Sequence, residues 1–524
     1  MAVRSGIMAR SMVRPAFCLV LALAAWWAAA PGGLLAPPLH AQTSGGANDL
    51  LAAELAYAHA RARHQDDVVA LEASRPGYTF WRHVFTIPDG HIAFGSALDG
   101  RLLAVFPTRG DWTRDGTWQD PALARLLEGR RLPRRLDDRR ELVGDLLERS
   151  AGPIVQNPTR GLFVLPNARR YGQFLRDWGA IYERFGVPAE IGLAQAMVES
   201  GLNPTRRSSA RAVGFCQWLL GNWRRLDRLT PDVLEAYNQT TQAPYCAAYL
   251  TILATKYGSF VPALSEHHSG GTNIGRTLIN GERLGGEDVR ERYFLGSQLA
   301  RDLRQISLYG FRELYRTYGP RSYYYSEMVF ANAATVAALT ASTPQVTIHA
   351  MRAPRALPLA EIARRTKLPQ DELRRYNPAL RTRVPAGATL YLPMHVEEFG
   401  RDVAFWHRPP SPAFASVLHE FLRLDTQTDR WDDRAFEPVL RRFERRFRET
   451  NTEEGRVMAT VLAYAIEETF LSRRAAILAE FRTDAAVRRL FDRALVAVGT
   501  SGAFRASLGD ASLPESDSDD PTSR

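Results

Sequence analysis

The sequence predicts a mainly α protein that has a small β-α-α-β module and flanking helical regions. Apolar residues recur at helical spacing over residues 165–340, which we interpret as one all-α domain, and again over residues 412–500. Between them, residues 346–393 have the pattern of a strand, two helices and a second strand. The chain has 524 residues, 45% of them hydrophobic and 24% charged, which excludes a fibrous or wholly disordered protein.

The N-terminal segment predicts export. Three arginines, Arg4, Arg10 and Arg14, precede an apolar stretch at residues 16–31, and a Pro/Gly-rich stretch and a polar stretch follow. This order is typical of a secretory signal peptide, which we place at residues 1–41. An uncleaved anchor is the alternative, although the apolar stretch is shorter than the roughly 20 residues that span a bilayer. We therefore expect an exported protein that is periplasmic or associated with the cell envelope.

Residues 42–164 are expected to form an α/β region, to which the sequence assigns no role. A helix is predicted over residues 50–75, and the turn pairs Asp89-Gly90 and Asp99-Gly100 predict short strands beside them. The strands are expected within residues 80–95 and 101–110, and further helices within residues 124–129, 139–150 and 168–185. At the other end of the chain, residues 501–524 are acidic and rich in serine, which predicts a disordered tail.

The net charge, the motifs and the cysteines limit which partners and cofactors we expect for this protein. The formal net charge of +10 is spread along the chain, so a polyanionic cell wall fits it and we expect no nucleic-acid partner. No HExxH, Walker-type or GxGxxG motif with the right flanks occurs, so we expect no metal and no cofactor. Cys216 and Cys246 follow the signal peptide, and we expect two buried, unpaired residues, with a disulfide as the less favoured alternative.

Glu199 is the candidate catalytic residue. Pro188 and Glu190 favour the start of a helix, which should stop at Gly201. Glu199 then lies in the last turn, near the negative end of the helix and among apolar neighbours, and both surroundings should raise its pKa. A carboxyl group that stays protonated near neutral pH can donate its proton to a glycosidic oxygen. If only its position in the helix is considered, a glutamate at a helix end is more commonly a surface residue without a catalytic role.

Three motifs occur in order over residues 199–326. The first, ESGLNPTRRSSARAVGFCQW at residues 199–218, resembles the signature of lysozyme-like soluble lytic transglycosylase domains, with Cys216 in place of a tryptophan. Its matching positions are Glu199, Ser200, Pro204, Ser208, Ala212, Gly214 and Gln217. The second, ALSEHHSGGTNI at residues 263–274, has His267 and His268 at the family's Tyr-Asn positions. The third, RSYYYS, aligns Tyr325 with the family tyrosine.

The resemblance implies a lysozyme-like all-α catalytic domain in which Glu199 is the only acid and base. Glu199 would protonate the oxygen between N-acetylmuramic acid and N-acetylglucosamine, and its carboxylate would then remove the proton of the muramyl C6 hydroxyl. That hydroxyl would attack C1 and form a 1,6-anhydro end. Gln217 and Tyr325 would hydrogen-bond the sugar or the acid, and Ser200 would orient the glutamate or the substrate. His267 and His268 either replace phenol and amide as binding groups or alter the activity.

The module at residues 346–393 is similar to a LysM domain, a fold that binds glycans containing N-acetylglucosamine. The matching positions are Leu359, Ile362, Ala363, Asn377, Pro378, Leu380, Pro385, Gly387, Leu390, Leu392 and Pro393. Residues 354–356 replace the family's Gly-Asp-Thr, so glycan binding and a structural spacer are both open. Together with the signal peptide and the transglycosylase-like motifs, this module resembles the architecture of the lytic murein transglycosylase D type.

These observations predict a peptidoglycan lytic transglycosylase, a carbon-oxygen lyase that acts on the glycan strands of the cell wall. Peripheral association with the membrane or the cell wall would accompany this role. The alternative is a catalytically impaired peptidoglycan-binding or scaffolding protein that keeps the lysozyme-like groove. A hydrolytic muramidase is a third reading, and it needs a second carboxylate. The acids nearest downstream are Asp227, Asp232 and Glu235, and nothing in the sequence pairs any of them with Glu199.

Overall fold

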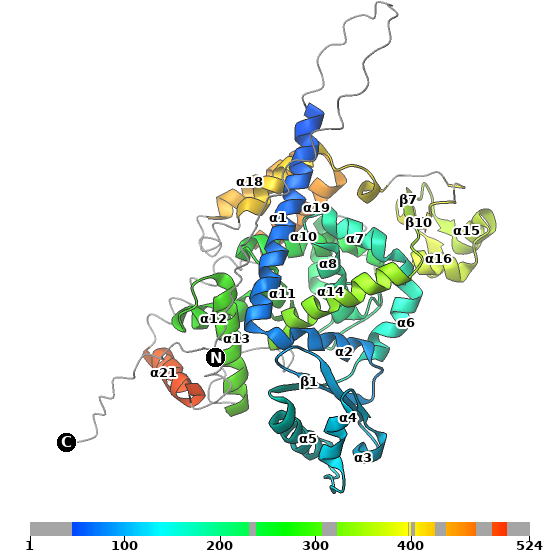
Figure 1. Cartoon of the computed structure of the whole chain (residues 1–524). Coiled ribbons are helices and arrows are strands. Elements are labelled where there is room, and N and C mark those ends of the chain that lie inside the picture. Colours follow the sequence, from blue (N-terminus) through cyan, green and yellow to red (C-terminus); the bar gives the residue numbers. More distant parts are fainter. Residues whose placement is uncertain are drawn as a thin grey trace, which may run out of the picture. The chain divides into compact units, whose positions relative to one another are not determined.

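The computed structural model is mainly α-helical with small antiparallel sheets (Figure 1), as the sequence predicts at this level. It describes residues 45–229, 237–306, 322–396, 398–399, 404–424, 436–467 and 485–499. The expected signal peptide and C-terminal tail lie outside these residues. Within them, no helix has the length and the apolar character that a membrane crossing requires.

The N-terminal region combines helices with a four-stranded sheet. Its long helix α1 (Gly45–Ser74) confirms the predicted one. The sheet has the order β3-β2-β1-β4, and all its neighbouring strands are antiparallel. The strands are β1 (His91–Ser96), β2 (Leu102–Pro107), β3 (Thr117–Trp118) and β4 (Ile154–Pro158). The helices beside the sheet are α3 (Trp112–Asp115), α4 (Pro121–Ala124) and α5 (Leu136–Ala151). Helix α2 (Trp81–Thr86) packs on α6 (Gly161–Tyr171) and α14 (Tyr325–Ser342) instead.

One part of the strand prediction is wrong, because residues 81–86 form helix α2 and not a strand. The buried side chains in this segment are Trp81, Val84 and Phe85, together with Phe80 just before it. Spacings of one, three and four residues place these side chains on one helical face, whereas a strand would alternate them. The strand predicted after Asp89-Gly90 is confirmed as β1, and the sequence did not signal β4.

Where the structure describes the segment expected to be all-α, its regular elements are helices and one short hairpin. Its helices before the hairpin are α6 (Gly161–Tyr171), α7 (Leu175–Arg184) and α8 (Ala189–Ser200). The hairpin pairs β5 (Ala212–Val213) with β6 (Trp218–Leu219). The helices after it are α9 (Leu220–Leu229), α10 (Gln239–Tyr257), α11 (Phe260–Ser269), α12 (Gly271–Arg283), α13 (Val289–Ile306) and α14 (Tyr325–Ser342).

Helix α8 lies deep in the protein, since almost all its residues are buried. It packs against α7 and α14. The hydrophobic core around it also receives side chains from the flanking regions, including Leu71 of α1 and Trp81 of α2. A helix that is apolar around most of its circumference must be enclosed in this way. The N-terminal helices therefore belong to the same core as the helix that bears Glu199.

The strand-helix-helix-strand order predicted for residues 346–393 is confirmed. The strand β7 (Ile348–Arg352) pairs antiparallel with β10 (Thr389–Pro393). Between them lie β8 (Leu357–Pro358), α15 (Leu359–Thr366), α16 (Gln370–Tyr376) and β9 (Arg383–Val384). Ile362, Leu373 and Leu390 contribute to a separate small core. The module is tied to the start of α10, where Asn238 Nδ2 donates to the Tyr376 carbonyl oxygen at 3.0 Å.

The helices predicted within residues 412–500 are present wherever this segment is described. They are α17 (Pro412–Leu422), α18 (Glu437–Glu449), α19 (Glu453–Glu467) and α21 (Ala485–Gly499). Helix α19 packs on α10 and on α18, and its side chains join the same core as α8. Glu467 lies at the surface, where it pairs with Arg225.

Candidate active site

Helix α8 ends where the sequence predicts, and this stop places Glu199 in its last turn. Gly201 caps the helix with φ 62°, a left-handed conformation that costs glycine little. A side chain at this position would also be blocked, because a Cβ atom would lie 2.2 Å from the Phe163 carbonyl oxygen. The helix therefore stops at Gly201 for a backbone reason and a packing reason.

Replacing Gly201 by alanine is expected to lower the free energy of unfolding by more than about 1 kcal/mol, since alanine is strained at positive φ. Gly221→Ala is the matched control, because Gly221 lies in helix α9 and a Cβ there meets nothing within 4 Å. Urea unfolding of both variants checks this, and equal stability for the two would contradict it.

Three side chains converge on one oxygen of the Glu199 carboxylate. The hydroxyl of Tyr325, the first residue of α14, donates to Glu199 Oε1 at 2.6 Å. From the last turn of α11, His268 Nδ1 lies 3.7 Å and His267 Nε2 3.9 Å from the same oxygen. The Glu199 side chain is only 12% exposed. None of these contacts uses the second oxygen, Oε2.

The two histidines are held differently. The side chain of His267 is 4% exposed, and its Nε2 donates to the Cys216 carbonyl oxygen at 2.8 Å, so Nε2 carries a hydrogen. His268 is 30% exposed, and its ring stacks on the Tyr325 ring with centroids 4.3 Å apart. His267 is therefore enclosed beside the Glu199 carboxylate, whereas His268 lies between this carboxylate and the solvent.

The expectation that the Glu199 pKa is raised is wrong. Burial acts in that direction and is the largest influence, but His268, the charge of His267 and the Tyr325 hydroxyl together outweigh it. The pKa of Glu199 is therefore lowered. Burial also lowers the pKa of His267, although Glu199 acts against this. The two imidazoles that lower this pKa belong to α11, a different helix from the one that bears Glu199.

The expectation of two unpaired cysteines is also wrong, because Cys216 and Cys246 form a disulfide. The loop after α8 folds back onto α10 and brings their Cα atoms to 6.1 Å, within the range that a disulfide bridges. The bond fixes the residue whose carbonyl oxygen accepts from His267. It thus supports the histidine beside the candidate acid.

Ser200 and Gln217 do not contact the Glu199 carboxylate. Ser200 is fully buried, and its hydroxyl lies 2.9 Å from the carbonyl oxygens of Ala196 and Phe215. The Gln217 Nε2 donates to the Arg206 carbonyl oxygen at 2.9 Å, within the same loop. Both side chains hold the loop that follows α8. Because Ser200 is fully buried, its side chain cannot contact a substrate directly in this structure.

Buried charges anchor α11, the helix that bears the histidines, and the sequence reasoning missed them. Asp67 of α1 accepts from the Ser259 hydroxyl and the Phe260 N–H at the start of α11, each at 2.6 Å. At the other end, Lys256 Nζ lies 2.8 Å from Glu266 Oε2, and both side chains are 3% exposed. Glu266 thus has its own partner. The sequence did contain a signal for this buried pair, because Lys256 is a rare lysine in an arginine-rich chain and follows an apolar stretch.

The structure therefore brings together four of the six predicted site residues: Glu199, His267, His268 and Tyr325. Of the acids considered for a second carboxylate, Asp232 and Glu235 lie outside the described residues. A scan of the chain against models of known protein families and a search of curated proteins find no match.

Proposed function

We propose that the protein is a peptidoglycan lytic transglycosylase with a lysozyme-like catalytic domain, which cleaves the MurNAc-β-1,4-GlcNAc bond and leaves 1,6-anhydro-MurNAc ends. The observation that carries this proposal is the Glu199 carboxylate, which is nearly buried at the end of α8 and held through Oε1 by Tyr325. Its contacts are two imidazoles and a phenol, and they leave Oε2 for a reacting sugar oxygen. This arrangement suits a reaction that one carboxyl group performs alone.

Glu199 would act twice in this reaction. Protonated at Oε2, it donates its proton to the glycosidic oxygen as the bond from that oxygen to C1 of MurNAc breaks. The resulting carboxylate takes the proton of the C6 hydroxyl on the same sugar. The C6 oxygen then bonds to C1, which closes the anhydro ring without consuming water. Atoms balance, and Glu199 ends protonated as it began.

The surroundings of Oε1 favour the first of these steps. The carboxylate formed when the proton leaves is stabilised by the Tyr325 hydroxyl and by the two histidines, which together make Glu199 a stronger acid. The same interactions reduce the fraction of Glu199 that is protonated at neutral pH. The rate is therefore expected to depend on pH.

The value of kcat/KM is expected to rise as the pH falls from 7 to 5. Because the pKa of Glu199 lies below its ordinary value of 4.5, the protonated fraction grows about tenfold for each unit by which the pH falls in this range. In His268→Phe, the largest interaction that lowers this pKa is lost and burial remains, so the profile should move to higher pH. Initial rates at constant ionic strength measure both profiles. If the pH profile of kcat/KM is the same in His268→Phe as in the native chain, Glu199 is not the group whose protonation sets the rate.

We also propose that the protein acts in the periplasm or at the cell envelope, with peptidoglycan glycan strands as its partner. The disulfide between Cys216 and Cys246 supports an oxidising compartment. The β-α-α-β module would serve as a LysM-like glycan-binding unit or as a spacer. Its position against the start of α10 suits either role.

A second candidate is a catalytically impaired protein that binds peptidoglycan through the same groove. The lowered pKa of Glu199 and the imidazoles beside it favour this reading, because a carboxylate that resists protonation is a poor general acid at neutral pH. Such a protein would bind the cell wall and release no product.

The experiment that tests the proposal is incubation of purified residues 42–524 with peptidoglycan sacculi, followed by mass spectrometry of the released muropeptides. A lytic transglycosylase yields products that lack one water relative to those of a hydrolase. Products with a reducing end would instead identify a muramidase. Sacculi that retain the protein without any release would support the second candidate.

A further inference from the structure

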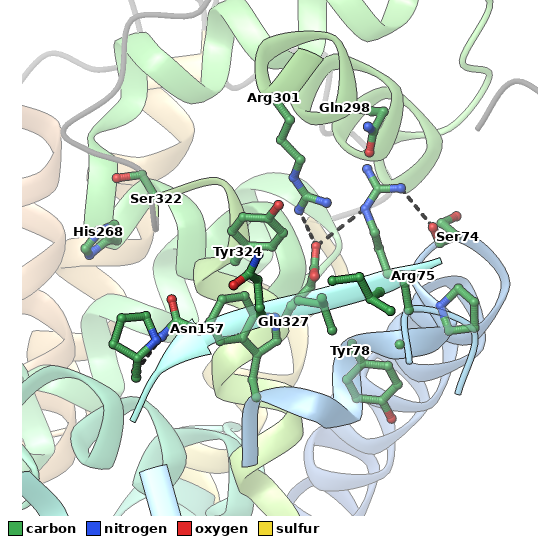
Figure 2. Close-up of a pocket in the computed structure, with 18 of the residues that line it drawn as sticks. Ser74, Arg75, Tyr78, Asn157, His268, Gln298, Arg301, Ser322, Tyr324 and Glu327 are labelled. Atoms are coloured by element: carbon green, nitrogen blue, oxygen red, sulfur yellow. Dashed lines mark hydrogen bonds and ion pairs between the residues drawn. The ribbon is translucent and has the colours of Figure 1, made fainter. Parts of the chain in front are cut away.

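A large cavity lies one side chain away from the candidate acid. It has a volume of about 1040 Å³, and His268 lines it together with residues of α1, β4, α13 and α14. Figure 2 shows His268 in the wall of this cavity, with Tyr324 drawn between it and the pair of arginines. Because the His268 ring stacks on Tyr325, whose hydroxyl contacts Glu199, the cavity begins one side chain away from the acid.

Positive charge exceeds negative charge in the described lining of this cavity. Three guanidinium groups, of Arg75, Arg140 and Arg301, face one carboxylate, that of Glu327. Arg75 Nε lies 3.4 Å from Glu327 Oε1, and Arg301 pairs with the same oxygen. Figure 2 draws both contacts. One carboxylate thus serves two guanidinium groups.

The two arginines are buried, so this imbalance is not relieved by water. The side chains of Arg301 and Arg75 are 9% and 11% exposed. Burial, and then the charge of Arg301, lowers the pKa of Arg75 to about 10. Among the described residues, Arg301 Nε has no hydrogen-bond partner. Arg75 also donates to the carbonyl oxygens of Ser74 and Phe294, each at 2.8 Å, so the shortage of partners lies with Arg301. A buried charge that lacks a partner is costly, and an incoming anion relieves that cost.

Nearby acids compensate these charges only in part. Asp302 follows Arg301 in the chain but does not line the cavity, and burial raises its pKa to about 6. Arg140 lies 3.6 Å from Asp137, whose side chain is 81% exposed, so that pair is strongly screened. The described lining of the cavity therefore carries an excess of positive charge.

An edge strand of the described sheet forms another wall of the cavity. Strand β4, residues 154–158, lines the cavity along its whole length and is a terminal strand of the described sheet. Edge strands bind extended peptides through main-chain hydrogen bonds. Side-chain amides of Gln156, Asn157 and Gln298 line the same space. An extended chain with carboxylate groups fits both walls at once.

We propose that this cavity binds the carboxylate-bearing peptide stems of peptidoglycan, so that the substrate is a peptide-substituted glycan strand and not a bare one. This inference rests on the proposed function, because the cavity lies one side chain away from the candidate acid. Arg301 and Arg75 bind the carboxylate, Arg140 lies on the wall of β4, and the strand edge binds the peptide backbone. The glycan then reaches Glu199 past His268.

Two measurements on residues 42–524 test the inference. The first is calorimetric binding of a soluble stem tetrapeptide, with acetate and inorganic phosphate as anion controls. The second compares the cleavage of peptide-substituted glycan strands with that of strands stripped by an amidase. We expect the tetrapeptide to bind more tightly than either anion, and substituted strands to be cleaved at least tenfold more efficiently.

Single substitutions show which arginines of the cavity bind the peptide. Arg301→Gln is expected to weaken peptide binding at least tenfold and to remove the preference for substituted strands. Arg140→Gln should have a smaller effect in the same direction, and it tests the wall of β4 if Arg301→Gln fails to fold. Arg149→Gln is the matched control, because Arg149 lies on the same helix α5 as Arg140, is exposed and does not line the cavity.

The outcomes separate this inference from the proposed function. Equal release of anhydro products from both kinds of strand, without peptide binding, would overturn the inference and leave the lyase intact. Peptide binding that needs Arg301, without anhydro product from either strand, would support the cavity and overturn the proposed chemistry. Acetate or phosphate binding as tight as that of the peptide would overturn the peptide assignment.

Discussion

Replacing Glu199 by glutamine is expected to lower the rate of anhydro-product release by about 10²- to 10⁴-fold, the usual contribution of a general acid or base. Glutamine keeps the size of the side chain and can still accept from the Tyr325 hydroxyl, but it holds no transferable proton. Because one carboxyl group would serve both steps, no other residue is expected to rescue either step. Muropeptide release from sacculi, followed by mass spectrometry, measures the loss.

The matched control is Glu190→Gln, at the other end of the same helix. Glu190 lies in the first turn of α8 and pairs with Arg61, so its replacement changes a charge on α8 away from the site. Rates within about threefold of the native chain are expected for Glu190→Gln, because exposed ion pairs contribute little. Glu199→Gln should still pellet with sacculi and unfold at the native temperature. Full turnover by Glu199→Gln would eliminate Glu199 as the acid.

Local features of the chain were predictable from the sequence. The stop of α8 at Gly201 depends on one glycine and its neighbours, and the structure confirms it. The strand-helix-helix-strand order of residues 346–393 depends on short apolar patterns and turn residues, and it is confirmed as well. In both cases the information lies within a few residues of the feature.

Features that depend on distant segments were not predictable. Burial raises the pKa of Glu199, but His268, His267 and Tyr325 together lower it by more, and these residues lie far from Glu199 in the sequence. The position of Glu199 at a helix end carries no information about them. The pairing of Cys216 with Cys246 depends on how the loop after α8 folds onto α10. Each error arose because tertiary packing outweighed a local rule.

The resemblance identified positions without indicating how each is used. Ser200 and Gln217 match the family signature, yet here they bind backbone carbonyl groups within the protein. Gly214 matches too, and its role is steric, because a Cβ there would lie 2.1 Å from Gln242 Oε1. That amide oxygen accepts from the Phe215 N–H at 2.7 Å. These positions shape the loop that supports His267.

Removing the disulfide tests how strongly this loop depends on its covalent link. The double substitution Cys216→Ala, Cys246→Ala is expected to lower the free energy of unfolding by about 3–4 kcal/mol, the loss of chain constraint for a loop of this size. The bond joins residues 30 apart in sequence, and it links the loop after α8 to α10. Urea unfolding under oxidising conditions measures the difference.

A reductant distinguishes the disulfide from the packing of the two sulfur atoms. The native chain should lose most of this stability in a strong reductant, whereas the double variant should not respond. The loss should also reach the site, since the Cys216 carbonyl oxygen accepts from His267, which lies 3.9 Å from Glu199. A looser loop would leave His267 less well held and shift the pH profile of kcat/KM. Equal stability with and without reductant would show that the core around α10 holds the loop without the bond.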